Sequence, residues 1–193
     1  KLYGDRLDTA YFPRSGQSLR VDAFEALTAL GADDGYRRLE AIWTGAQTLA
    51  AHGVWVSPDD IATLVKRGVG VSHNPESNMK LASGTAPVSK YLAAGVAVGI
   101  GTDGAASNND LDMFEAMRQA ALLHKLVDND PRSVPAYTAL EMGTIGGARV
   151  LGMEQAIGSL EPGKRADLLL VGMRQARQTP LYDPISHLVY VTR

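Results

Sequence analysis

The stretch "VAVGIGTDGAASNND" (residues 96–110) begins as an apolar run without a charge and ends in small and polar residues. A strand of a parallel sheet is covered on both faces, so its sequence is a nearly continuous hydrophobic run. We therefore predict a buried strand within residues 96–104, with Asp103 at its end. Parallel strands carry ligands and chemistry at their C-terminal ends, so Asp103 stands where a functional group is expected.

Two earlier segments repeat the same order of features. Residues 48–56, "TLAAHGVWV", and residues 69–74, "VGVSHN", are apolar, β-branched stretches that carry His52 and His73. Each is followed by a loop or a helical pattern, and alternating strands and helices indicate βαβ units with a parallel sheet. We expect the two histidines and Asp103 to meet at one edge of that sheet.

Helix signals lie between and after these strands. Ser57 is a typical N-cap, Pro58 suits the first helical position and Gly68 follows the end of the pattern, which predicts a helix between them. Residues 75–86, "PESNMKLASGTA", are expected to form a loop. The further helices expected from apolar spacing are residues 87–94, 110–127 and 136–151.

The sequence patterns at the two ends of the chain differ from the alternating pattern of the middle. Residues 21–35 and 36–43 look helical, and no strand is expected before residue 45. A boundary is expected near Met153, with a small β element beyond it. Three divisions are expected: residues 1–45 with helix and loop, residues 46–152 with the βα units, and residues 153–193. In the last division we predict a turn at Glu161–Lys164 and strands at residues 166–171 and 187–191.

Composition bounds the class of protein. The chain has 193 residues, of which 45% are hydrophobic, and a formal net charge of −2, which is typical of one or two globular domains. No basic face suggests a nucleic acid or membrane partner. The absence of Cys excludes disulfides and thiolate ligands, so a metal would need His and carboxylates. Without a membrane-spanning run or an N-terminal signal core, a cytoplasmic location is the default expectation.

Each candidate residue also has an ordinary structural explanation. Asp103 could cap the following loop, but a carboxylate at the end of a buried strand needs a cation or hydrogen-bond donors. His52 and His73 could be core histidines with satisfied hydrogen bonds. We expect His124, on the core side of a helix, and His187 to be structural.

Two apparent nucleotide motifs fail on their context. The pattern G-x-G-x-x-G at Gly99, Gly101 and Gly104 should open directly into a helix, yet it is followed by "AASNND" and includes Asp103. Gly163–Lys164 has no Ser or Thr after the lysine, as a phosphate loop would. Neither motif predicts a nucleotide cofactor.

Four stretches together resemble the amidohydrolase superfamily: "LAAHGVWVSPDDI", "VSHNPESNMKLASGTAPV", "GTDGAASNNDLDMFEAMRQAALLHK" and "GSLEPGKRADLLLV". The resemblance extends from about Arg38 to the end and is strongest to 5-methylthioadenosine/S-adenosylhomocysteine deaminases and their triazine-hydrolase relatives. It implies a (β/α)8 TIM barrel with a β-sandwich made by both chain ends. Residues 48–56, 69–74 and 96–104 would be the sixth, seventh and eighth barrel strands.

The resemblance also implies a mononuclear zinc site. Asp103 would be a metal ligand and the proton shuttle, and His52 would hydrogen-bond the metal-bound hydroxide or the substrate. Both residues are therefore the expected catalytic and substrate-binding groups. The substrate would be a purine nucleoside or another heteroaromatic amine that releases ammonia; a triazine-type chlorohydrolase or another aminohydrolase is the alternative.

The sequence departs from the family pattern at the other metal ligands. The H-x-H pair of the first strand and the fifth-strand His with its nearby Glu do not occur, and residues 1–51 contain no His. Only one of four expected protein ligands is present. Either the chain is part of a longer deaminase, or it is a catalytically inactive half-barrel scaffold that associates through exposed sheet edges. The sequence leaves a homo-oligomer open.

Overall fold

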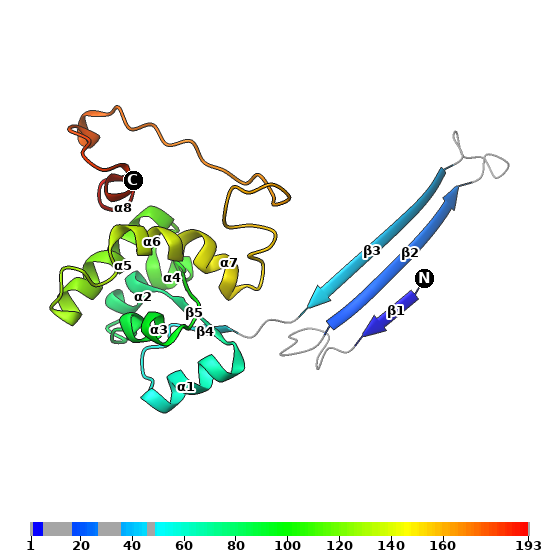
Figure 1. The fold of residues 1–193 in the computed structure, drawn as a ribbon, viewed down its shortest axis with the longest axis horizontal. Helices are drawn as coiled ribbons and strands as arrows, with labels where there is room; N and C mark the ends of the chain where they lie inside the picture. The colour runs from blue at the N-terminus through cyan, green and yellow to red at the C-terminus, as the bar shows by residue number, and fades with distance from the viewer. Residues whose placement is uncertain (1, 6–16, 27–35, 46–48, 193) are drawn as a thin grey trace. The chain divides into compact units, whose positions relative to one another are not determined.

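The structure is a computed structural model that describes residues 2–5, 17–26, 36–45 and 49–192. The chain divides into two compact units, Lys1–Thr48 and Leu49–Arg193 (Figure 1). In the described part of the chain, no helix is both long and apolar enough to cross a membrane.

The first unit holds an antiparallel sheet in the order β1-β2-β3. Its strands are β1 (Leu2–Asp5), β2 (Gln17–Ala26) and β3 (Tyr36–Gly45). β2 pairs with β3 along its whole length, from Gln17 opposite Gly45 to Ala26 opposite Tyr36. The helical interpretation of residues 21–26 and 36–43 is therefore wrong, because ten-residue pairing between strands outweighs local helix propensity. Residues 27–35 lie outside the described residues.

The second unit contains the predicted parallel sheet. Its strands are β4 (Leu49–Ala51), β5 (Gly70–His73) and β6 (Val98–Ile100), in the order β4-β5-β6. Ala51 lies opposite Ser72, and His73 lies opposite Ile100. All three strands run in the same direction, so their C-terminal ends lie at one edge, as the sequence predicts.

Helices surround this sheet (Figure 1). In chain order they are α1 (Pro58–Arg67), α2 (Pro75–Lys80), α3 (Val88–Ala94), α4 (Ala105–Asn108), α5 (Met113–Asp128), α6 (Ala136–Glu141), a π-helical turn (Met142–Gly146), α7 (Gly147–Val150), a 3-10 turn (Ala176–Gln178) and α8 (Pro184–Tyr190). The core joins β5 and β6 to α1, α3, α5, α6 and α8 through fully buried side chains such as Val71, Tyr91 and Val189.

The predicted start and end of α1 are confirmed. Ser57 Oγ accepts a hydrogen bond from the Asp60 backbone N–H at 3.2 Å, and Asp60 Oδ2 accepts one from the Ser57 N–H at 2.8 Å. These reciprocal bonds form a capping box. At the other end Gly68 adopts a left-handed conformation with φ 63°.

The loop expected at residues 75–86 begins with a helix instead, α2. Pro75 occupies its first turn, where a fixed φ favours helix and the missing N–H costs nothing. The helix spans only Pro75–Lys80, and residues 81–86 form a loop as expected. The short helix matters because two of its side chains reach the strand ends described below.

Glycines let the helical segment after Ala136 pack directly on β6. A Cβ on Gly146 would lie 2.6 Å from the Val98 carbonyl oxygen, and one on Gly99 would lie 2.8 Å from Gly147 Cα. Both glycines therefore allow close packing, and the helix expected at residues 136–151 is interrupted there by the π-helical turn. Gly99, the first glycine of the apparent nucleotide motif, serves this contact.

The C-terminal segment contains the turn at Glu161–Lys164 but no strand within the described residues 153–192. Residues 166–171 have no neighbouring strand to pair with, and Leu170 is 95% exposed. Residues 187–191, expected as a strand, fall mostly within α8. Asp183 Oδ1 caps that helix by accepting from the Ser186 N–H at 2.6 Å, and Pro184 favours its first turn, so local helix signals decide the structure.

Candidate active site

His52 and Asp103 meet at the C-terminal edge of the parallel sheet. His52 directly follows β4, and its backbone N–H donates to the Ser72 carbonyl at 2.9 Å, which extends the sheet pairing to this residue. Asp103 follows β6 by three residues. The His52 Nε2 and Asp103 Oδ2 atoms are 3.8 Å apart, with side chains 38% and 31% exposed. The expected convergence of these two side chains is thus present.

The 3.8 Å separation leaves space for a bridging group. It exceeds the length of a direct hydrogen bond, which is about 2.7–3.2 Å when nitrogen donates to oxygen. A water molecule or a polar substrate atom could lie within hydrogen-bond distance of both side chains. The pair is therefore arranged to act on a third group.

Both residues adopt backbone conformations that favour glycine. The φ angle is 64° at His52 and 61° at Asp103. A left-handed conformation in a residue other than glycine costs on the order of 1 kcal/mol or more, and such strain is concentrated at functional sites. The strain supports a functional reason for placing these two side chains together.

Hydroxyl groups stabilise the ionised form of Asp103. Ser77 Oγ and Ser107 Oγ each donate a hydrogen bond to Asp103 Oδ2 at 2.7 Å. Together with a backbone hydrogen bond from Gly104, they lower the pKa of Asp103 to about 2. A carboxylate that favours its anionic form so strongly is suited to holding a cation at neutral pH.

His52 is oriented by an amide from α2. Its Nδ1 atom lies 2.7 Å from Asn78 Oδ1, and the Asn78 side chain is buried at 1% exposure. Sequence reasoning missed Ser77, Asn78 and Ser107. The sequence does carry a signal for them, because small polar residues follow the second strand in "PESN" and the third strand in "GAASNND".

His73 does not share this opening, although it ends β5. Its side chain is fully buried, with Nε2 3.0 Å from Nε2 of His124. Burial is the main cause that lowers the pKa of His73 to about 3 and the pKa of His124 to about 4, so both rings are neutral at pH 7. As expected, His124 is part of the core. His187 contacts the backbone carbonyls of Asp183 and Pro180.

The described residues do not form a metal centre on their own. Among residues 2–5, 17–26, 36–45 and 49–192, no three His, Asp or Glu side chains gather closely enough to hold an ion. Asp103 is one suitable ligand, whereas a catalytic zinc takes about three protein ligands. The donor set of this chain therefore fits only part of a zinc site.

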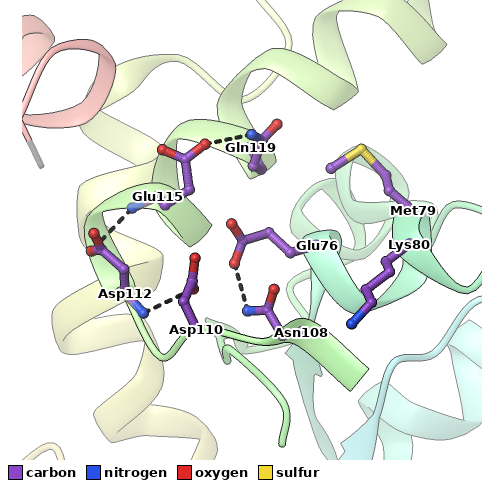
Figure 2. A pocket seen from close by; sticks show the side chains of 8 residues that line it. All are labelled: Glu76, Met79, Lys80, Asn108, Asp110, Asp112, Glu115 and Gln119. Atoms are coloured by element: carbon purple, nitrogen blue, oxygen red, sulfur yellow. Dashed lines mark hydrogen bonds between the residues drawn. The ribbon is translucent and has the colours of Figure 1, made fainter. Parts of the chain in front are cut away.

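An acidic pocket lies beside α2, away from the His52–Asp103 pair. Glu76, Asp110, Asp112 and Glu115 are among the residues that line a pocket of about 480 Å³. In Figure 2 they come from α2, from the segment before α5 and from α5. Burial raises the pKa of Glu76, and the neighbouring carboxylates raise it further, while a 2.8 Å hydrogen bond from Asn108 opposes them. Neither His52 nor Asp103 lines this pocket, so it is separate from the candidate active site.

A parallel sheet with helices between its strands, and with an acid and an imidazole at its C-terminal edge, defines the general class, an α/β protein built of βα units. The chain belongs to the amidohydrolase family, whose family model matches residues 25–193.

Two curated relatives are deaminases. The chain is 62% identical over 142 residues to 5-methylthioadenosine/S-adenosylhomocysteine deaminase of Desulforudis audaxviator, covering 74% of this chain and 33% of that protein. It is 56% identical over 146 residues to 5'-deoxyadenosine deaminase of Methanosarcina mazei, covering 76% and 33%. The chain thus spans about a third of the length of these relatives.

A solved structure supports the same relationship. The crystal structure of an adenosine deaminase from Xanthomonas campestris with bound zinc aligns with a TM-score of 0.72 and 47% identity, covering 74% of this chain and 33% of that one. The α/β unit therefore aligns with part of an amidohydrolase structure.

Proposed function

We propose that this chain is the C-terminal part of a metal-dependent deaminase that hydrolyses adenosine-type thioethers, such as 5-methylthioadenosine or S-adenosylhomocysteine, and releases ammonia. The observation that carries the proposal is the 3.8 Å approach of His52 Nε2 to Asp103 Oδ2 at the sheet edge. By their names, one of the relatives above acts on 5-methylthioadenosine and S-adenosylhomocysteine and the other on 5'-deoxyadenosine, so both act on adenosine-type molecules. Their identities of 62% and 56% are why we place deamination ahead of triazine dechlorination.

In this proposal Asp103 would hold a divalent metal ion, and residues outside this chain would supply the other ligands. Zinc would supply a bound water whose pKa is lowered far below that of bulk water, to near neutrality. The anionic state of Asp103, favoured by Ser77 and Ser107, suits the ligand role. The chain covers only 33% of the length of each of these relatives, which is consistent with metal ligands that lie outside it.

The two side chains have complementary tasks during hydrolysis. Asp103 accepts a proton from the attacking water as its oxygen bonds to the amine-bearing ring carbon. The same proton then passes to the amine, and the carbon–nitrogen bond breaks to release ammonia. His52 faces the same opening, where its Nε2 accepts a hydrogen bond from the attacking water and orients it.

The surrounding fold is proposed to be the last three βα units of a (β/α)8 barrel, with residues 153–193 forming part of a β-sandwich. The exposed side chains of Leu168, Leu169 and Leu170, at 54%, 80% and 95%, support this proposal. An extended apolar segment of that kind is expected where strands outside this chain would cover it.

The test is an ammonia-release assay combined with metal analysis. We expect the full-length protein that contains this chain to bind about one zinc ion and to release ammonia from 5-methylthioadenosine. We expect the 193-residue chain by itself to bind zinc weakly and to release none. Full-length protein that binds no metal and deaminates no adenosine derivative would contradict the proposal and favour the scaffold alternative.

A further inference from the structure

We propose that Asn78 is a positioning residue that selects the tautomer of His52, a role that rests on the proposed function of the His52–Asp103 pair. Its side-chain oxygen holds the proton of His52 on Nδ1. This leaves Nε2 as a hydrogen-bond acceptor facing Asp103. The effect is to keep open the gap in which a water or substrate group is bound.

For a neutral His52 ring, the contact with Asn78 selects one of the two tautomers. Asn78 Oδ1 lies 2.7 Å from His52 Nδ1, and an amide oxygen can only accept a hydrogen bond. In the neutral imidazole one nitrogen donates and the other accepts, so a donating Nδ1 requires an accepting Nε2. Asn78 belongs to α2 and is 1% exposed, which gives its oxygen a fixed position.

The distance across the opening agrees with this tautomer. His52 Nε2 and Asp103 Oδ2 remain 3.8 Å apart. If Nε2 carried the proton, it would be expected to donate directly to the Asp103 carboxylate at about 2.8 Å and close the gap. Two facing acceptors instead stay apart and are bridged by a group that donates to both.

The same helix also fixes the other half of the pair. Ser77, the neighbour of Asn78 in α2, donates to Asp103 Oδ2 at 2.7 Å and is 1% exposed. Successive residues of one short helix therefore hold Asp103 and His52. Their relative position is set by α2 and does not depend on the two strained loops alone.

The test measures the tautomer and the kinetics in the full-length protein. Long-range 1H–15N spectra of protein labelled at histidine nitrogen report which nitrogen of His52 is protonated. We expect Nδ1–H in the parent protein and loss of that preference in Asn78→Leu. We also expect kcat to fall by about tenfold or more with KM changed far less, as is typical when a group that orients a reactive residue is lost.

Asn78→Asp provides the rescue, because a carboxylate also accepts from Nδ1–H. It should restore the tautomer and recover most of the lost kcat. Gln178→Met is the matched control, because Gln178 is another buried amide that donates to Thr192 at 3.2 Å and contacts neither His52 nor Asp103. If Asn78→Leu fails to fold, the smaller and polar Asn78→Ser replaces it in both measurements.

The outcomes separate this inference from the proposed function. Retention of Nδ1–H in Asn78→Leu, or an equal loss of kcat in Gln178→Met, would overturn the positioning role. The tautomer is read without turnover, so a parent protein that lacks deaminase activity refutes the proposed reaction while the spectra still decide the role of Asn78.

Discussion

At the scale of the residue, Asp103 combines three features that seldom occur together at a purely structural site. It has a left-handed backbone, two serine donors on one oxygen and a histidine 3.8 Å away. The donors stabilise the anion and the backbone strain opposes folding. A residue held in this way at a sheet edge is expected to act on a ligand.

Replacing Asp103 by Asn tests this interpretation. Asn tolerates the left-handed backbone but removes the charge and the proton acceptor. We expect ammonia release by the full-length protein to fall by about 10²–10⁴-fold, with metal content reduced. Asp130→Asn is the control, because that carboxylate also has a lowered pKa, through Arg132, and is not at the opening. Equal losses in both variants would argue against a special role for Asp103.

At the scale of the element, the strand-and-helix pattern predicts the second unit well where local signals agree with long-range packing. The capping box of Ser57 and the apolar runs of β5 and β6 are examples. Sequence reasoning failed where the two compete. Residues 36–43 have a helix-like sequence pattern, but ten-residue pairing between β2 and β3 makes them a strand. Residues 187–191 are an apolar run that resembles a strand, but the Asp183 cap favours a helix there.

The contact between the π-helical turn and β6 gives a prediction on stability. Gly146→Ala would bring Cβ within 2.6 Å of the Val98 carbonyl oxygen, a backbone atom that cannot easily move away. We expect the free energy of unfolding to fall by about 1–3 kcal/mol, measured by denaturant titration. Gly172→Ala is the control, because nothing lies within 4 Å of a Cβ built there. A stability unchanged by Gly146→Ala would show that the helix is not in direct contact with β6.

The buried histidine pair predicts how stability depends on pH. Burial lowers the pKa of His73 to about 3 and that of His124 to about 4, whereas unfolded histidines titrate near 6.5. Between these values the unfolded chain binds more protons, so stability is full above pH 6.5 and is lost as the pH falls toward 4. The slope is up to about 1.4 kcal/mol per pH unit for each ring.

Urea titrations at several pH values measure this slope. The double variant His73→Phe/His124→Phe should flatten it, while His187→Asn, which changes a histidine bonded to two backbone carbonyls, should leave it unchanged. An unchanged slope in the double variant would place the acid sensitivity elsewhere.

At the scale of the whole molecule, the outer edge of β4 pairs with no strand among the described residues, and Leu168–Leu170 is exposed. In the proposed full-length protein we expect additional structure to cover both. In the proposed function, these three strands and the candidate ligand Asp103 make up only part of a barrel site. The sequence predicts the His52–Asp103 pair because strand order alone brings it together. It could not predict Ser77 and Asn78 as partners, since their roles depend on how α2 lies over the strand ends.

This incomplete surface predicts self-association of the isolated 193-residue chain. Exposed apolar segments and free strand edges pair with other copies. Light scattering should show oligomers that are reduced by Leu169→Lys/Leu170→Lys, because charge opposes such pairing. The matched control is Leu126→Lys, at 80% exposure on α5. Monomers at all concentrations would contradict the prediction.

The most direct measurement is anomalous diffraction at the zinc edge from crystals of the full-length protein. We expect the ion about 2.0–2.2 Å from a carboxylate oxygen of Asp103, with His52 Nε2 facing the same opening. An ion bound elsewhere, or Asp103 and His52 turned to separate cavities, would contradict the metal-dependent deaminase assignment.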